Sequence, residues 1–158
     1  MNWRPLSNDE YPCNHLAAIL QDVDVHSLDG KACSPKWQAV LDTGSDYTVV
    51  PSSVAAHLDV NFTKMERKKL QMTGCLPNLC PVLYLQISHS DFGTLEPVKA
   101  AFMDRKTILL GRDCLNQMLL TIHGPKKQFI VHQSRSWWSL HVIRFMPGRI
   151  SRRFRPPG

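Results

Sequence analysis

The alternation of apolar and polar residues along the chain predicts a protein built almost wholly from short strands. Period-two alternation and short apolar runs bounded by Gly, Pro and Asn recur through the middle of the sequence, as expected for half-buried and buried strands. The predicted strands are residues 15–25, 37–41, 47–51, 82–88, 98–103, 107–110, 118–123 and 128–132. We expect short helices only in residues 52–58 and 112–117. The predicted fold class is all-β, a barrel or a sandwich.

Length and composition indicate one folded domain with an appendage at each end. At 158 residues, 43% of them apolar, the chain is long enough and apolar enough to build one core. Residues 1–15 contain Pro5 and Pro12 and have no periodicity, so we interpret them as an N-terminal arm. We assign residues 16–133 to the folded domain and residues 134–158 to a basic, aromatic C-terminal tail.

The tail differs from the rest of the chain in charge. The net charge is +6, yet no Asp or Glu follows Asp113, whereas eight Lys and Arg residues do. The last 45 residues therefore carry +8 and the first 113 carry −2. Arginines interleaved with aromatic residues in 134–158 suit weak contact with nucleic acid or with an anionic surface. The alternative is a solvated tail whose two tryptophans cover an edge of the core.

The five cysteines are odd in number and include no Cys-X-X-Cys pair, which argues against a disulfide framework and against a zinc module. We interpret them as reduced thiols, although Cys75 and Cys80 are close enough in sequence to cross-link under oxidation. The first ten residues lack the apolar core of a signal peptide, and no apolar run approaches the roughly 20 residues that span a bilayer. We therefore expect a cytoplasmic protein.

The candidate chemistry lies between two of the predicted strands. The apolar residues 39–41 lead into Asp42, Thr43 and Gly44, and a second apolar run follows at once. This pattern predicts a strand, a tight turn and a strand, with the Asp42 carboxylate presented at the turn, where it is suited to proton transfer. The alternative is an ordinary β-turn in which Asp42 caps its own backbone.

A second segment gives the turn a family resemblance. Together with Asp42-Thr43-Gly44, the downstream run of residues 108–111 followed by Arg112 and Asp113 resembles the paired motifs of retropepsin-like aspartic proteases, closest to the stand-alone bacterial kind. The resemblance covers roughly residues 17–132. It implies a retropepsin-like closed barrel with one or two short helices, and an active site at a two-fold dimer interface.

The resemblance also implies a reaction. Because the chain supplies one Asp-Thr-Gly only, Asp42 from each subunit of a homodimer would form the catalytic pair and activate a water that hydrolyses a peptide bond. No metal and no organic cofactor is implied. Thr43 would exchange hydrogen bonds with the other subunit's turn, and Gly44 would meet the backbone of a protein or peptide substrate. Donation from the Ser45 hydroxyl to an ionised Asp42 would shift activity to acid.

Two further roles follow from the resemblance. Asp46 and Arg112 would form a partly buried structural pair, costing roughly 3–5 kcal/mol on loss of one partner. The alternative is two solvated charges worth at most about 1 kcal/mol. Thr73 and Gly74 are the candidates for the tip of a flap that covers the substrate. The single glycine in this flap segment is atypical.

Two other functions remain open from sequence alone. A dimerising, catalytically inactive retropepsin-like module would hold peptides without cutting them; the atypical flap segment favours it, and the intact Asp42-Thr43-Gly44 opposes it. A nucleic-acid binder acting through its tail would lose affinity steeply as salt rises.

Overall fold

The computed structural model describes residues 3–6, 17–30, 35–71 and 76–132, which form two antiparallel-rich sheets and a few short helices. The larger sheet contains β2 (Ile19–Ser27), β3 (Trp37–Leu41), β4 (Val49–Pro51), β5 (Glu66–Leu70), β6 (Asn78–His89), β7 (Gly93–Thr94), β8 (Val98–Met103) and β9 (Ile108–Leu110). The smaller sheet contains β1 (Arg4–Pro5), β10 (Leu119–His123) and β11 (Gln128–His132). The helical segments are α1 (Ser53–His57), η1 (Phe62–Lys64), α2 (Arg112–Leu115) and η2 (Gly124–Lys126). The all-β prediction is confirmed.

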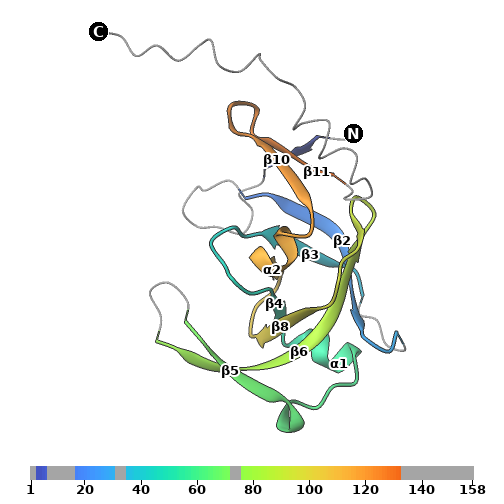
Figure 1. Cartoon of the computed structure of the whole chain (residues 1–158), viewed down its shortest axis with the longest axis vertical. Coiled ribbons are helices and arrows are strands. Elements are labelled where there is room, and N and C mark those ends of the chain that lie inside the picture. Colours follow the sequence, from blue (N-terminus) through green and yellow to red (C-terminus); the bar gives the residue numbers. More distant parts are fainter. Residues whose placement is uncertain (1–2, 7–16, 31–34, 72–75, 133–158) are drawn as a thin grey trace.

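The larger sheet curves around the main core (Figure 1). Its strand order is β2-β3-β9-β4-β8-β6-β5, and β2 also pairs with β6, so the pairings of the first six strands return to their starting strand. The β3–β9 and β4–β8 pairs are parallel. β6 is 12 residues long and pairs in turn with β2, β5, β7 and β8. β5 is not part of this ring of pairings; it pairs with β6 and ends the strand order.

Alternation explains why these segments form strands. The inward-facing residues of β2, β6 and β8 include Val23, Leu85, Ile87 and Phe102, all of them buried in one cluster. β3 and β8 have the predicted bounds, and α1 and α2 lie within the two segments predicted to be helical. β5 was not predicted, because four of its five residues are charged and its pattern carries no apolar alternation.

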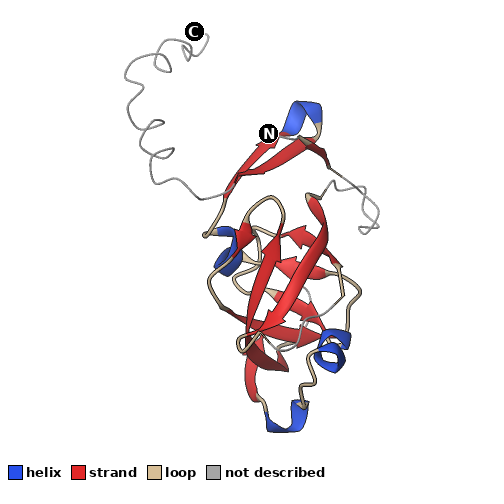
Figure 2. Cartoon of the chain, turned by 90° about the vertical axis from the view of Figure 1, so that its right-hand side faces the viewer, coloured by secondary structure: helices blue, strands red, loops and turns tan. Residues whose placement is uncertain are grey.

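The smaller sheet recruits the N-terminal arm. β1 pairs with β11 through Arg4 opposite Phe129 and Pro5 opposite Gln128, and β10 pairs with the other side of β11 as the predicted hairpin. Phe129 is fully buried in the main cluster, which joins this sheet to the barrel. The sheet lies at one end of the molecule, and β5 lies towards the opposite end (Figures 1 and 2).

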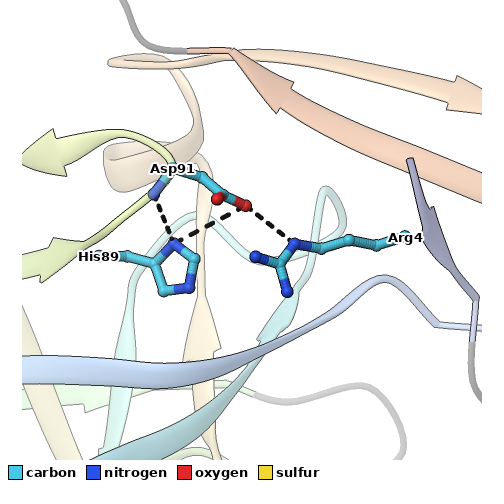
Figure 3. Close-up of polar contacts among 3 residues, drawn as sticks. All are labelled: Arg4, His89 and Asp91. Atoms are coloured by element: carbon cyan, nitrogen blue, oxygen red, sulfur yellow. Dashed lines mark hydrogen bonds and ion pairs between the residues drawn. The ribbon is translucent and has the colours of Figure 1, made fainter. Parts of the chain in front are cut away.

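A polar contact also attaches β1 to the barrel (Figure 3). The Arg4 Nε–H donates to Asp91 Oδ2 at 2.8 Å, and neither side chain is more than a third exposed, at 31% and 26%. Beside them, the buried His89 ring accepts the Asp91 backbone N–H at Nδ1, 3.0 Å away. A backbone N–H can only donate, so Nδ1 carries no proton and His89 is neutral, protonated at Nε2. Burial lowers the pKa of His89 below its ordinary value of 6.5, the Arg4 charge adds to this, and the Asp91 carboxylate opposes it.

Neither a membrane-spanning helix nor an exposed cysteine thiol occurs among the described residues. No helix among them is long and apolar enough to cross a membrane. Cys80 and Cys114 are free, buried thiols. Cys75, the predicted partner for an oxidative cross-link to Cys80, lies outside the described residues.

Candidate active site

The end of β3 presents Asp42. Parallel pairing places Leu41 opposite Leu110, and the Asp42 N–H extends this ladder by donating to the Leu110 carbonyl at 3.0 Å. The Ser45 N–H donates to the Asp42 carbonyl at 3.3 Å, which closes a turn, and the Gly44 N–H donates to Asp42 Oδ1 at 2.9 Å. The self-capping turn considered from sequence is therefore present. The Asp42 carboxylate is nevertheless half-exposed, with Thr43 and Gly44 exposed at the tip of the turn.

The turn forms the floor of an open cavity of about 390 Å³. Its lining comes from the turn itself, from β4 and β9, from the end of β5 and from the end of β8. The lining residues are Asp42, Gly44, Ser45, Asp46, Tyr47, Val49, Lys69, Leu70, Gln71, Met103 and Leu109. Asp42, Gly44, Ser45 and Asp46, all singled out from sequence, share this cavity.

A close backbone approach fixes the far side of the turn. The Arg112 N–H donates to the Ser45 carbonyl at 2.8 Å, which draws the start of α2 against the turn. A Cβ placed on Gly111 would lie 2.4 Å from the Tyr47 carbonyl carbon and 2.5 Å from its oxygen. The glycine in the second motif is therefore required by packing against the first motif, since any side chain there would displace the backbone of the turn.

Thr48 and Asp113 form a part-buried hydrogen-bonded support that the sequence did not reveal. The Thr48 hydroxyl donates to Asp113 Oδ1 at 2.7 Å, and the Thr48 N–H donates to Oδ2 at 3.0 Å. The same hydroxyl accepts the Gly111 N–H at 3.1 Å. Thr48 is fully buried. A carboxylate and a hydroxyl 65 residues apart thus hold the start of β4 on α2.

Cys114 completes this support as an inert thiol. Its sulfur lies 3.1 Å from the Thr48 hydroxyl. Burial raises the pKa of Cys114 to about 12, the neighbouring Asp113 charge adds to this, and the Thr48 hydrogen bond opposes it. The thiol therefore stays protonated near neutral pH and is suited to packing rather than nucleophilic chemistry.

The predicted hydrogen bond from Ser45 to Asp42 is wrong. The Ser45 hydroxyl donates to the Tyr47 carbonyl at 2.7 Å, two residues along the same turn. A hydroxyl has one proton, so this bond removes the donor on which the expected acid shift depended. Ser45 stabilises the turn rather than the charge on Asp42.

Asp46 and Arg112 form an ion pair, but the prediction that it is partly buried is wrong. Asp46 Oδ1 meets the Arg112 guanidinium, while the side chains remain 63% and 57% exposed, respectively. Solvated pairs of this kind contribute at most about 1 kcal/mol, because water screens the charges. The pair neutralises a second carboxylate of the cavity and does little for the fold.

The wall of the cavity beside β5 is basic, a feature that the sequence showed only as a run of charges. The Lys68 ammonium contacts the Tyr47 hydroxyl and lies 3.8 Å from the centroid of the Tyr47 ring. Lys69 and Leu70, which end β5, and Gln71 line the cavity together with Tyr47.

Several predicted features lie outside the described residues. These are the flap candidates Thr73 and Gly74 and the tail at 134–158. Within the described ranges, no group of three or more His, Cys, Asp or Glu side chains has the arrangement of a metal site.

Comparison with known proteins places the fold. The chain matches no protein-family model and no curated protein at the level of sequence. Among solved structures it is similar to a retropepsin-like aspartic protease from Rickettsia conorii, with a TM-score of 0.51 and 16% identity over 73% of this chain and 93% of that one. It also aligns with the EIAV protease solved with the inhibitor HBY-793, with a TM-score of 0.41 and 16% identity over 67% of this chain and 90% of that one. The chain therefore has the retropepsin fold, with Asp42 on the turn that the two sequence motifs hold together.

Proposed function

We propose that the protein is an aspartic endopeptidase that works as a homodimer. The observation that carries this proposal is the Asp42 carboxylate, half-exposed on a firmly supported turn at the floor of an open cavity, in a chain with the retropepsin fold. Cavities with a carboxylate placed in this way suit proton transfer to and from a bound water and a substrate carbonyl.

The reaction requires two carboxylates that share one proton. The ionised one takes a proton from water as the water oxygen attacks the peptide carbonyl carbon, and the protonated one donates to the carbonyl oxygen. The carboxyl that took the proton from water then gives it to the amide nitrogen, the other carboxylate takes a proton back from a hydroxyl of the tetrahedral intermediate, and the C–N bond breaks. Asp46 is the other carboxylate that lines the cavity, but it is paired with the Arg112 guanidinium. The second catalytic group is therefore Asp42 of another copy.

The smaller sheet offers a surface on which a second copy could dock. Within the described residues, β10 is an edge strand, so one row of its N–H and C=O groups has no strand partner. Trp3 beside β1, and Leu119 and Ile122 on β10, are exposed apolar side chains in the same region. Pairing of two such sheets would bury these side chains and satisfy the backbone groups.

The test is cleavage of denatured casein between about pH 3 and 7 by the full chain, with and without a transition-state analogue of aspartic proteases. We expect cleavage that is abolished by Asp42→Asn and by the analogue. It should rise more than linearly with enzyme concentration near the dimer dissociation constant. Asp59→Asn is the matched control, because it makes the same change at an exposed position outside the cavity and should leave cleavage unchanged.

One result would favour a peptide-binding module over an enzyme. A folded, dimeric protein that does not cut casein at any of these pH values would fit the inactive peptide-binding module, in which Asp42 serves the turn alone. Sedimentation velocity on the same samples shows whether an absence of cleavage comes from an absence of dimers or from an absence of catalysis by the dimer.

A further inference from the structure

Among the described residues, some charged side chains around the cavity have a partner of opposite charge and others do not. On the floor, Asp46 is paired with Arg112. Beside the cavity, β5 carries three successive cations, Arg67, Lys68 and Lys69, of which Lys69 is in the lining. No carboxylate partner for any of them occurs among the described residues. Glu66, which begins the strand, is paired instead with Lys99 at 2.6 Å. The wall therefore carries cationic charge that the surrounding described structure does not neutralise.

Lys68 does not itself line the cavity, but its ammonium is held against Tyr47, which does. Side chains alternate along a strand, so Lys68 and Leu70 share one face of β5 while Arg67 and Lys69 share the other. Lys68 is half-buried, and its ammonium is held by the hydroxyl and ring of Tyr47, which lines the cavity. An ammonium has three donors, and the Tyr47 hydroxyl uses one of them.

A peptide that fills the cavity must displace water from this wall. Loss of water around an unpaired ammonium is unfavourable unless the ligand supplies a charged acceptor. A glutamate or aspartate side chain would accept a charge-assisted hydrogen bond from Lys68, whereas a glutamine would accept a weaker one and a lysine would be repelled. Lys69, the next residue along and itself in the lining, adds to the same field.

We propose that β5 makes this cleft selective for acidic peptides, with Lys68, held by Tyr47, as the residue that determines specificity. The proposal rests on the proposed function only in taking the ligand to be a peptide in the cavity beside Asp42. It names the substrate class as unstructured segments with an Asp or Glu side chain close to the cleaved bond.

The first test measures binding, so that it does not depend on cleavage. Full-length Asp42→Asn protein is titrated into two fluorescent, unstructured peptides that differ only in Glu against Gln at their central positions. We expect the Glu peptide to bind about fivefold more tightly at low salt, with the ratio falling towards one as salt shortens the range of the charge interaction. Adding Lys68→Met should remove the preference, and Lys68→Arg should keep it. Lys106→Met is the control for loss of one exposed positive charge outside the cavity.

The second test measures selectivity in cleavage. Mass spectrometry of casein products should find Asp and Glu enriched within a few residues of the cut bonds relative to casein as a whole, and this enrichment should be lost in Lys68→Met. Discrimination in binding without any cleavage would support the acidic specificity and overturn the proposed function. Cleavage that requires Asp42, with no preference for Glu in either test, would overturn the acidic specificity and leave the proposed function in place. A preference that survives in the Lys68→Met, Lys69→Met double variant would also overturn it.

Discussion

Two contacts that hold parts of this molecule together, here called joints, each have an aspartate as hydrogen-bond acceptor. The groups around the two aspartates differ. At the active-site joint, Asp113 accepts the hydroxyl and N–H of Thr48, and Gly111 lies against the Tyr47 backbone. At the arm joint, Asp91 accepts the guanidinium of Arg4 and lies beside the buried His89 ring. The first joint is made by uncharged donors and steric fit, and the second by charges and a titratable ring.

The difference has a physical consequence. A hydroxyl and a backbone N–H keep their protons between about pH 7.5 and 5.5, so the support beneath Asp42 has no donor that titrates in that range. A buried neutral histidine must take up a proton as the pH falls, so the contact that attaches β1 becomes weaker in acid. The site that we assign to acid–base chemistry therefore rests on the joint that pH disturbs less. The sheet that we assign to dimer formation rests on the other.

The largest expected effect is on the steric part of the active-site joint. Gly111→Ala would place a methyl group 2.4 Å from the Tyr47 carbonyl carbon, where only a backbone shift can relieve the overlap. We expect a loss of about 3 kcal/mol in the free energy of unfolding, measured by urea denaturation. Gly124→Ala, where a Cβ meets nothing within 4 Å, is the matched control and should change little. A loss below about 1 kcal/mol would mean that the turn is not tightly held.

The next effect is on the hydrogen-bonded part of the same joint. Thr48→Val keeps the shape but removes the hydroxyl that serves both Asp113 and Gly111. We expect a loss of about 2 kcal/mol, because the hydrogen bond from the buried Thr48 hydroxyl to the half-buried Asp113 carboxylate is broken. The loss should be equal at about pH 7.5 and 5.5, since no threonine proton titrates. Thr94→Val, at an exposed strand position, controls for the change of residue type. A loss that varies strongly with pH would break the comparison between the joints.

The arm joint should show the opposite behaviour. The folded protein lowers the pKa of His89 from 6.5, so the unfolded chain binds a proton at a higher pH than the folded chain does. Stability from the neutral ring is therefore complete above pH 6.5 and is lost as the pH falls from 6.5 through the lower folded value. We expect the urea midpoint to fall between about pH 7.5 and 5.5, and to fall less in His89→Gln. His57→Gln, at an exposed ring, should follow the unmodified protein.

The smallest effect should come from the exposed Asp46–Arg112 ion pair beside the Asp42 turn. Asp46→Asn and Arg112→Gln should each cost at most about 1 kcal/mol, and a double-mutant cycle should give a coupling energy of about 0.5 kcal/mol that salt reduces. A coupling energy above about 3 kcal/mol would instead indicate a desolvated pair, as the sequence first predicted. In that case the active-site joint would also contain a strong charge interaction.

Local pattern was enough to predict most of the strands, whereas the retropepsin-like barrel was predicted from the family resemblance. β3 and β8 alternate or run apolar over their whole lengths, and the hairpin of β10 and β11 has turn residues between two apolar runs. β5 and β1 were missed for one reason: each forms because a partner strand accepts it, β6 in one case and β11 in the other. Their own residues are charged, or include a proline, and carry no periodic signal.

The site was predictable in its motifs but not in its hydrogen bonds. Asp42 could be singled out because it follows an apolar strand, and the segment of residues 108–113 because it resembles the second retropepsin motif. The destination of the Ser45 proton depends on the geometry of its turn, and the Thr48–Asp113 bond joins residues 65 apart. No spacing rule connects such residues. One sequence signal did point to this support. Thr48 lies in an apolar run, and a buried threonine needs a hydrogen-bond partner.

The charges of β5 have a second consequence, for how the protein behaves among other chains. β5 ends the strand order of the larger sheet, so within the described residues it presents an edge that other extended chains could join. Lysines and arginines on such an edge oppose strand addition by any chain that is not itself acidic, and so protect against aggregation. Replacing them to alter specificity would also remove that protection, so solubility and substrate choice would change together on this strand.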